Sequence, residues 1–535
     1  MRWILMFIFL SITVFFILSS KPKQQEQDFS KLHSNPDHRR KVIWIMADSL
    51  MSQAIDQGIK SGDLPAFSFL ISHGHYQKEV ISSFPTMSVT VDSTLITGAH
   101  PDRHHIPGLI WFDNQEQRIV NYGTGLNEIL RDGLTQAAED MVQNLNHKHL
   151  NQEIQTIFEA LEERGIRTGS INGLIYRGSN DHKLAFPSWV AKPLSLPDQV
   201  NVKAPDFFAL GMFANPLQGK VSLPDGLTKE FGFKDAYSVE ATKYLIKNDL
   251  LPDFLFVYLP DLDKPLHKKG PGPQEKKAVQ KLDREIAELL DSFGSWNEAI
   301  QHVTWVVCGD GGQTSIVPSN QNPVVQLDQL LNNYQVLKPG QQPSEKTEVA
   351  LAVNERSAFV YALKQEISLN KLADQLKKDD RVDILAWKNE NGWIQVFNAE
   401  KNTEMQFRPG QEFEDSYHQK WDMKGDLKAL DLTVKADKKQ ISYGDYPDAL
   451  IRLWTSFHSH SGRYLIITAR PGYELADVHS PTHKGGAGHG SLHQIDSVAP
   501  MIITGTDQRP AHWRLVDMKP WILSLFDSPT TESKR

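Results

Sequence analysis

The chain has 535 residues, of which 40% are hydrophobic, and its formal net charge at neutral pH is −8. This length accommodates one large domain with an insert, or two to three domains. Acidic and basic residues are interspersed and no long basic block occurs, so nothing indicates a nucleic-acid-binding surface. The single cysteine, Cys308, excludes an internal disulfide.

Residues 1–20 are predicted to be a transmembrane anchor or a signal segment. The run from Trp3 to Ser20 is uncharged and strongly apolar, close to the roughly 20 residues that a bilayer-spanning helix needs. Its length, and the absence of an Ala-x-Ala step after it, favour a single-pass membrane anchor over a cleaved signal peptide. We therefore expect a cell-membrane protein whose main domain is extracytoplasmic, or a secreted protein if the segment is cleaved. Residues 21–40 are polar without periodicity, which is typical of a tether.

Short apolar runs, typical of buried strands, recur along the rest of the chain. They are Lys41 to Ser49, Asp253 to Asp263, His302 to Gly312, Arg463 to Arg470 and Ala499 to Gly505. Amphipathic patterns between them predict helices over residues 151–165 and 275–293. This alternation predicts an α/β fold with a mostly parallel sheet flanked by helices, built from residues 41–320 and 448–530.

Residues 321–447 differ because their apolar runs are shorter and more polar. The pattern predicts a strand, a helix and two strands in that order. Their expected ranges are 357–364, 369–378, 382–388 and 392–398. We interpret this region as a small α+β insert that shapes access to the main domain.

Three of the apolar runs end in acidic residues. Asp48 and Asp310 end two of them, and Asp263 follows a third, with His267 four residues later. Ligands of open α/β sheets bind beyond the carboxyl ends of the strands. A single Asp in such a place is usually a capping or turn residue, but three with a nearby His indicate a metal site. Carboxylates with imidazoles suit Zn²⁺, and Mn²⁺ is the alternative.

Two further segments fit such a site. His489 lies in a late Gly-rich stretch, where it is expected to be another metal ligand. Thr86 follows Pro85 at the expected start of a helix. A Thr hydroxyl is a poor nucleophile unless a base or a metal lowers its pKa. Asp48 and Asp310 could hold such a metal beside Thr86, and two metals are a known solution for in-line phosphoryl displacement.

Four separated blocks resemble the alkaline phosphatase superfamily, and within it the type I phosphodiesterase / nucleotide pyrophosphatase branch. In chain order they are FPTMSVTVDSTLITGAHPDRHHIPG, DKPLHKKGPG, GDGGQ and GAGHGSLH, and with the first strand they span residues 41–315 and 450–505. The resemblance implies an alkaline phosphatase-like fold. It also implies a metal-dependent hydrolase that prefers phosphodiester or nucleotide pyrophosphate bonds and acts through a covalent phosphothreonine.

The resemblance also implies roles for individual residues. One divalent metal ion would be bound by Asp263, His267 and His489, and a second by Asp48 and Asp310. Thr86 would be the nucleophile, close to the second metal. The substrate would be a small-molecule phosphate ester.

The chain departs from the family pattern at two places. Gly311 stands where the family has a second-site His. The second metal would therefore be bound weakly, or a water or Gln313 would take the place of the His. Val91 stands where the family often has a phosphate-binding Asn. Substrate contacts are therefore predicted for Thr90, Asp92 and His493 instead.

Three alternatives remain open at this point. The same scaffold could act as a phosphomonoesterase, or as a transferase of phospho-headgroups of envelope lipids or polymers, which the membrane anchor would suit. Because Gly311 replaces a metal-binding His, the protein could also be a binding protein on a decayed phosphatase scaffold. The sequence names neither the natural substrate nor the oligomeric state.

Overall fold

The computed structural model describes residues 22–32, 41–123, 135–338, 340–435, 437, 439–478 and 480–527. Its largest elements are two sheets. Among the described residues, seven strands form the first sheet in the order β2-β24-β10-β1-β9-β5-β8. Their bounds are Gly74–Ile81, Val498–Thr504, Val303–Cys308, Lys41–Ala47, Phe254–Leu259, Thr168–Ile171 and Phe207–Ala209.

The strands from β10 to β8 run parallel, whereas β24 is antiparallel to both β10 and β2. The predicted α/β fold is therefore confirmed, with a mixed sheet. The last apolar run, Ala499 to Gly505, was expected among the parallel strands, and the structure places it in the antiparallel β24.

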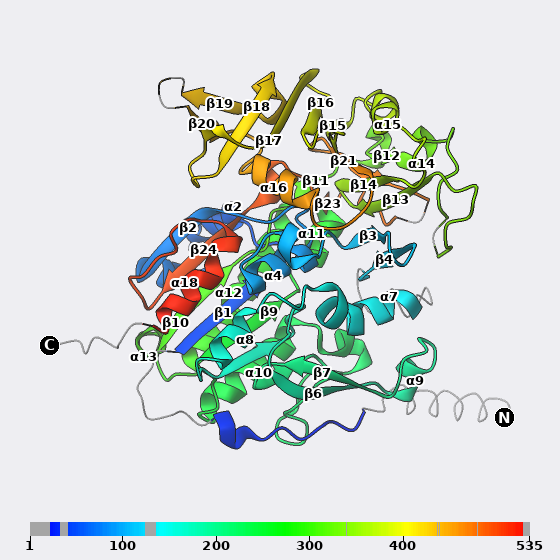
Figure 1. The fold of residues 1–535 in the computed structure, drawn as a ribbon. Helices are drawn as coiled ribbons and strands as arrows, with labels where there is room; N and C mark the ends of the chain where they lie inside the picture. Colours follow the sequence, from blue (N-terminus) through cyan, green and yellow to red (C-terminus); the bar gives the residue numbers. More distant parts are fainter. Residues whose placement is uncertain are drawn as a thin grey trace.

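Helices cover both faces of this sheet (Figure 1). Alternate residues of β1 point to opposite faces, as the period of a strand requires. Ile43 and Ile45 pack in one apolar cluster and Trp44 and Met46 in another. The first cluster includes residues of α2 (Ser52–Lys60), α3 (Pro65–Ser72), α10 (Asp235–Lys247), α12 (Pro273–Asp291) and α13 (Trp296–His302). The second includes residues of α4 (Ser88–Thr97), α8 (Ile157–Glu162) and α18 (Met518–Leu525).

The predicted helix over residues 275–293 corresponds to α12, which begins two residues earlier at Pro273. The helix predicted over residues 151–165 is shorter than expected. Thr156 and Glu159 form a capping box, in which each side chain accepts a hydrogen bond from the other's backbone N–H. Because a capping box stabilises the first turn, α8 begins at Ile157.

A second sheet is formed chiefly by the region interpreted as an insert. In the described part of the chain its strands follow the order β13-β14-β21-β15-β16-β17-β20-β19, and β18 pairs with β17. Their bounds are Val349–Asn354, Ser357–Ala362, Tyr464–Ala469, Val382–Lys388, Ile394–Asn398, Thr403–Glu414, Gln440–Tyr443, Leu432–Lys435 and Lys420–Gly425. The expected order of strand, helix, strand, strand is confirmed by β14, α15 (Leu369–Leu376), β15 and β16.

One strand connects the two predicted parts. Tyr464–Ala469, expected in the first sheet, forms β21 and pairs with β14 and β15 of the second. The apolar run predicts a strand correctly. The sequence of a strand that is buried on both faces does not indicate which sheet the strand joins. Figure 1 shows the second sheet above the first, with α11 (Asp263–Lys269), β11 (Thr314–Ser315) and β23 (Ala487–Gly488) between them.

No helix among the described residues has the length and apolar character needed to cross a bilayer. The segment from Trp3 to Ser20 lies outside the described residues. The membrane anchor and the extracytoplasmic location therefore stay predictions.

Candidate functional site

Three carboxylates meet at the carboxyl end of the first sheet. β10, β1 and β9 are neighbours in the sheet, and Asp310, Asp48 and Asp263 follow them. Ser49 links all three. Its N–H donates to Asp310 Oδ1 at 2.9 Å, and its hydroxyl lies 3.0 Å from Asp263 Oδ1 and 3.3 Å from Asp48 Oδ1. The adjacent parallel strands thus bring together acids that are far apart in the sequence.

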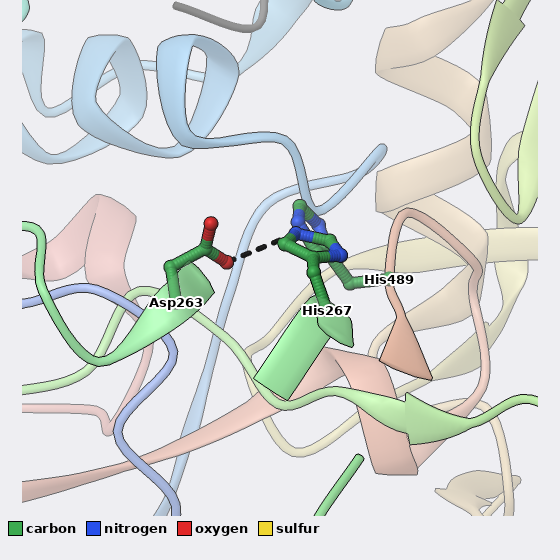
Figure 2. Close-up of side chains that lie close together, drawn as sticks. All are labelled: Asp263, His267 and His489. Atoms are coloured by element: carbon green, nitrogen blue, oxygen red, sulfur yellow. Dashed lines mark ion pairs between the residues drawn. The ribbon is translucent and has the colours of Figure 1, made fainter. Parts of the chain in front are cut away.

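Two imidazoles complete a group around Asp263, as Figure 2 shows. His267 lies one turn along α11, with Nε2 3.0 Å from Asp263 Oδ1. His489 follows β23, and its ring centroid is 5.3 Å from that of His267. One ligand atom from each of the three residues lies within 4.8 Å of the others. We call Asp263, His267 and His489 the histidine half-site, and Asp48 and Asp310 the carboxylate half-site.

The histidine half-site fits a divalent metal ion. His267 Nδ1 lies 2.9 Å from the Ala487 carbonyl oxygen, and His489 Nδ1 lies 2.6 Å from the Thr86 carbonyl oxygen. Each Nδ1 must therefore carry a proton to donate, so Nε2 is the atom of each ring that could bind a metal once it has lost its own proton. Metal-binding histidines are oriented by partners of this kind. One carboxylate and two imidazoles are a donor set that suits zinc.

The charges at the site also favour a cation. Burial raises the pKa of the Asp48 carboxyl well above its usual range, and the charges of Asp310 and Asp263 raise it further. Burial likewise raises the pKa of Asp310. Burial opposes ionisation of Asp263, but His267 outweighs it and the pKa of Asp263 is lowered. A bound cation would relieve the repulsion among these carboxylates.

Thr86, the predicted nucleophile, lies directly against the His489 loop. Its hydroxyl oxygen accepts a hydrogen bond from the Gly490 N–H at 2.8 Å, and its carbonyl oxygen accepts from His489 Nδ1. Gly490 has φ +105°, and a β-carbon there would lie 2.5 Å from the Asn354 carbonyl oxygen. Only glycine can therefore bring this backbone donor to the threonine oxygen.

The carboxylates of Asp48 and Asp310 accept hydrogen bonds from nearby hydroxyl groups. The hydroxyl that bonds to Asp310 Oδ2 is that of Ser88, at 3.0 Å. Among the described residues, Asp48 and Asp310 belong to no group of three close metal-binding side chains. The amide nitrogen of Gln313 donates to Asp263 Oδ1 at 2.6 Å, so this side chain is directed toward the histidine half-site.

Gly311 has a steric reason to be glycine. A β-carbon at this position would lie 2.9 Å from the Asp496 carbonyl oxygen and 3.7 Å from the Thr86 β-carbon. The first distance is shorter than a real contact allows, and the obstacle is backbone. A histidine would therefore not fit there without movement of the turn around Asp496.

The three predicted substrate-contact residues lie in different surroundings. Thr90 and Asp92 belong to α4 and are fully buried, and no hydrogen-bond partner for their side-chain oxygens is present among the described residues. Their burial argues against direct substrate contact in this conformation. His493 caps a short helix, where its ring accepts from the Ile495 N–H. The substrate roles of these residues stay predictions.

Sequence reasoning missed two residues next to the histidine half-site. Glu355 Oε1 lies 3.8 Å from His267 Nε2 and 3.9 Å from His489 Nε2. The ring of His483 packs on that of His267 with centroids 4.3 Å apart, and its Nδ1 lies 3.1 Å from Glu474 Oε2. Glu355 lies in the region taken as an insert, and no spacing from the other motifs marks it. For His483, nearness to the Gly-rich block was the available signal.

Comparison with known proteins identifies the family. The family model of type I phosphodiesterase / nucleotide pyrophosphatase matches residues 42–491. No curated protein sequence matches the chain. Solved structures are similar in fold at low sequence identity, and three of them follow.

Human ectonucleotide pyrophosphatase / phosphodiesterase 5 is 14% identical with a TM-score of 0.52, and the match covers 91% of this chain and 95% of that one. An inactive variant of the murine protein, in complex with AMP, is 13% identical with a TM-score of 0.53 and the same coverage. Phosphonoacetate hydrolase from Sinorhizobium meliloti, in complex with phosphonoformate, is 13% identical with a TM-score of 0.55. That match covers 95% of this chain and 99% of the other.

The family match extends over the second sheet, over the first sheet except β24, and over all the predicted site residues except His493. The chain therefore belongs to the type I phosphodiesterase / nucleotide pyrophosphatase family and is a hydrolytic enzyme of the phosphoester-cleaving kind.

Proposed function

We propose that the protein hydrolyses phosphodiester or nucleotide pyrophosphate bonds with Thr86 as the covalent nucleophile and divalent metal ions as cofactors. The observation that carries the proposal is the direct contact between the nucleophile and the His489 loop. Gly490 donates to the Thr86 hydroxyl oxygen, and the adjacent His489 belongs to the histidine half-site.

The residues around Thr86 support a nucleophilic role. A backbone N–H that donates to Oγ1 favours the deprotonated hydroxyl, because it stabilises negative charge on that oxygen. The bond from His489 Nδ1 to the Thr86 carbonyl oxygen fixes the main chain of the nucleophile relative to the histidine half-site. When bound, divalent zinc would supply positive charge that lowers the pKa of a hydroxyl or water and stabilises phosphoryl oxygens.

The proposed reaction has two displacements. In the first, Thr86 Oγ1 forms a bond to phosphorus as the ester oxygen of the leaving group departs. In the second, water attacks the phosphothreonine, the bond from Oγ1 to phosphorus breaks, and the hydroxyl is regenerated. The proton of the Thr86 hydroxyl leaves with the departing ester oxygen in the first step, and a proton of the attacking water restores the hydroxyl in the second.

The test is turnover of two chromogenic substrates by the zinc-loaded full chain, a nitrophenyl nucleotide diester and nitrophenyl phosphate. We expect the diester to be the better substrate. Thr86→Ala should lower kcat/KM for it by at least about 1,000-fold, as expected when a covalent nucleophile is removed. Acid quenching during turnover should trap phosphate on Thr86, detectable by mass spectrometry.

Thr97→Ala is the matched control, because Thr97 lies at the far end of α4 and its hydroxyl donates only to the Ser93 carbonyl oxygen. Its turnover should equal that of the unaltered protein. Undiminished turnover in Thr86→Ala would overturn the proposed mechanism, and preference for the monoester would favour a phosphomonoesterase.

A further inference from the structure

A hairpin turn of the second sheet reaches the histidine half-site. Glu355 and Arg356 form the two-residue turn between β13 and β14, since Asn354 pairs with Ser357. Glu355 has φ +54°, a left-handed conformation that is unfavourable for a residue with a β-carbon. Glycine or asparagine would be the expected residue in such a turn. A glutamate kept at a strained position beside a candidate site suggests that its side chain has a role there.

The carboxylate of Glu355 faces the two imidazoles. Its Oε2 accepts a hydrogen bond from the His489 N–H at 3.0 Å. Its Oε1 lies 3.8 Å from His267 Nε2 and 3.9 Å from His489 Nε2, and the described residues provide no hydrogen-bond donor to it. Two ligand atoms on a tetrahedral zinc ion are about 3.4 Å apart, given bonds of about 2.1 Å. The distances from Glu355 Oε1 to the two nitrogens, 3.8 and 3.9 Å, are therefore only slightly longer than the distance between two ligand atoms of the same zinc ion.

The turn is held firmly in this position. The Arg356 N–H donates to the His489 carbonyl oxygen at 3.0 Å, and the Leu475 N–H donates to the Glu355 carbonyl oxygen at 2.8 Å. The Arg356 guanidinium is fully buried and forms an ion pair with Asp496. The Glu355 side chain is therefore directed at the half-site by a rigid backbone.

The neighbouring glycine leaves room for the carboxylate. A β-carbon on Gly488 would lie only 3.2 Å from Glu355 Oε2. A larger side chain at that position would press on the carboxylate. The Gly-rich loop that carries His489 is thus shaped around Glu355 as well as around Thr86.

We propose that Glu355 is a fourth protein ligand of the metal ion bound by Asp263, His267 and His489. The inference rests on the metal site of the proposed function and adds a ligand that the second sheet supplies. Two carboxylates and two neutral imidazoles balance the charge of a divalent cation. This half-site would then hold its ion firmly, because its ligands come from both sheets, and zinc binding would depend on the docking of the β13–β14 hairpin.

His483 is assigned a positioning role. It lies behind His267, and its Nδ1 is engaged by Glu474. Its ligand atom is within 4.8 Å of those of His267 and Glu355, so it is the competing candidate for the fourth ligand. The experiment therefore includes a variant of this residue.

The test measures zinc affinity of the full chain by competition with a chromophoric chelator. Glu355→Gln keeps the size of the side chain and an acceptor for the His489 N–H, so the fold should persist, and thermal unfolding in chelator checks this. We expect zinc affinity to fall by about 10- to 100-fold or more, since the loss of even indirect partners of a metal has effects of this size. Glu412→Gln, on an exposed part of β17, is the matched control and should leave the affinity unchanged.

A second measurement separates ligation from a mere charge effect. The absorption bands of Co²⁺ substituted for zinc respond to the identity and number of its ligands. We expect Glu355→Gln to change these bands, and Glu355→Asp, which keeps the charge but shortens the reach, to change them as well. A lower affinity with unchanged bands would overturn ligation by Glu355.

Three further outcomes overturn the inference in distinguishable ways. If Asp263→Asn abolishes zinc binding while Glu355→Gln changes neither affinity nor bands, Glu355 is not a ligand and the proposed metal site stands. If His483→Gln changes the bands and Glu355→Gln does not, His483 is the fourth ligand. If Asp263→Asn and His489→Ala also leave zinc binding unchanged, the metal site of the proposed function itself fails.

Discussion

The two halves of the candidate site are built differently. The histidine half-site has two imidazoles, each held through Nδ1 by a backbone carbonyl, and both sheets contribute to its surroundings. The carboxylate half-site has two buried acids of the first sheet whose pKa values are raised. Gly311 stands where the resemblance to the family implies a further ligand, and the Asp496 carbonyl oxygen leaves no space there for a side chain. The first half-site therefore offers two oriented imidazoles, whereas the described residues add no imidazole to the two carboxylates of the second.

This contrast predicts unequal metal binding. A site whose ligands are oriented in advance binds its ion with less reorganisation. We accordingly expect one firmly bound ion at the histidine half-site and a second, weaker one at the carboxylate half-site. The predictions below test this inequality, beginning with the largest expected effect.

Asp263→Asn and Asp310→Asn should differ strongly in their effect on the first zinc ion. Asp263→Asn removes a ligand of the histidine half-site and should lower the affinity of the first ion by at least about 100-fold. Asp310→Asn should lower it by less than about tenfold and affect mainly the second ion. Isothermal titration with zinc measures both steps, and equal losses in the two variants would refute the inequality.

Gly311→Ala tests whether steric conflict prevents any side chain, and therefore any ligand, at position 311. The added methyl group would lie 2.9 Å from the Asp496 carbonyl oxygen, so we expect the free energy of unfolding to fall by about 1–3 kcal/mol. Gly311→His, which restores the family's residue type, should be at least as destabilising and should not tighten the second ion. Chemical denaturation and zinc titration check these outcomes. A stable Gly311→His protein with a higher affinity for the second ion would show that the turn around Asp496 moves to accommodate the side chain.

The stabilisation of the protein by zinc should depend on pH. The folded-state pKa values of Asp48 and Asp310 lie above their ordinary 3.8, and that of His267 lies above 6.5. In the metal-free protein, these protonated groups contribute stability that is lost as the pH rises through the folded-state values. The lowered pKa of Asp263 acts only as the pH falls below its ordinary 3.8, outside this range.

The contribution of these groups to stability should therefore fall between about pH 5 and pH 8. Buried histidines such as His100 and His460, whose pKa values are lowered to about 3, contribute with the opposite sign, so the measured quantity is the difference in Tm between the zinc-loaded and the chelator-treated protein. Zinc competes with protons for the same side chains, so the stabilisation by zinc should grow over the same range. Thermal unfolding with and without zinc measures this difference. If the difference in Tm between the protein with zinc and the protein without zinc became smaller as the pH rose, the assignment of these groups to a metal site would be contradicted.

Asp92→Asn should give the smallest effect and the opposite sign. Asp92 is fully buried without a partner for either oxygen among the described residues, and burial raises its pKa well above the usual range. The neutral amide removes the cost of ionisation, so the protein should gain about 1 kcal/mol of stability at pH 8 and less near pH 4. Asp198→Asn, at an exposed position, is the control. A loss of stability at pH 8 would indicate that ionised Asp92 has a partner, such as a metal ion.

Much of the site could be predicted because its chemistry follows local patterns. The acids that end β1 and β10, and Asp263 just after β9, are recognisable from short apolar runs followed by polar residues. The spacing of Asp263 and His267 places them one helical turn apart, where side chains meet. The opening turn of α8 was misjudged because the apolar period continues past a capping box that decides where the helix begins.

The α/β class, the acids at the strand ends, the candidate nucleophile and the family follow from the amino-acid sequence alone. These features depend on local periodicity and on motifs of fixed spacing, which a single sequence contains. The pairing of β21 with the second sheet and the position of Glu355 beside His267 and His489 became visible only in the folded chain. It alone also revealed that Gly311 adjoins the Asp496 carbonyl oxygen. Each of these is a contact between segments far apart in the chain, and strand pairing and close packing, not local sequence, determine which distant residues meet.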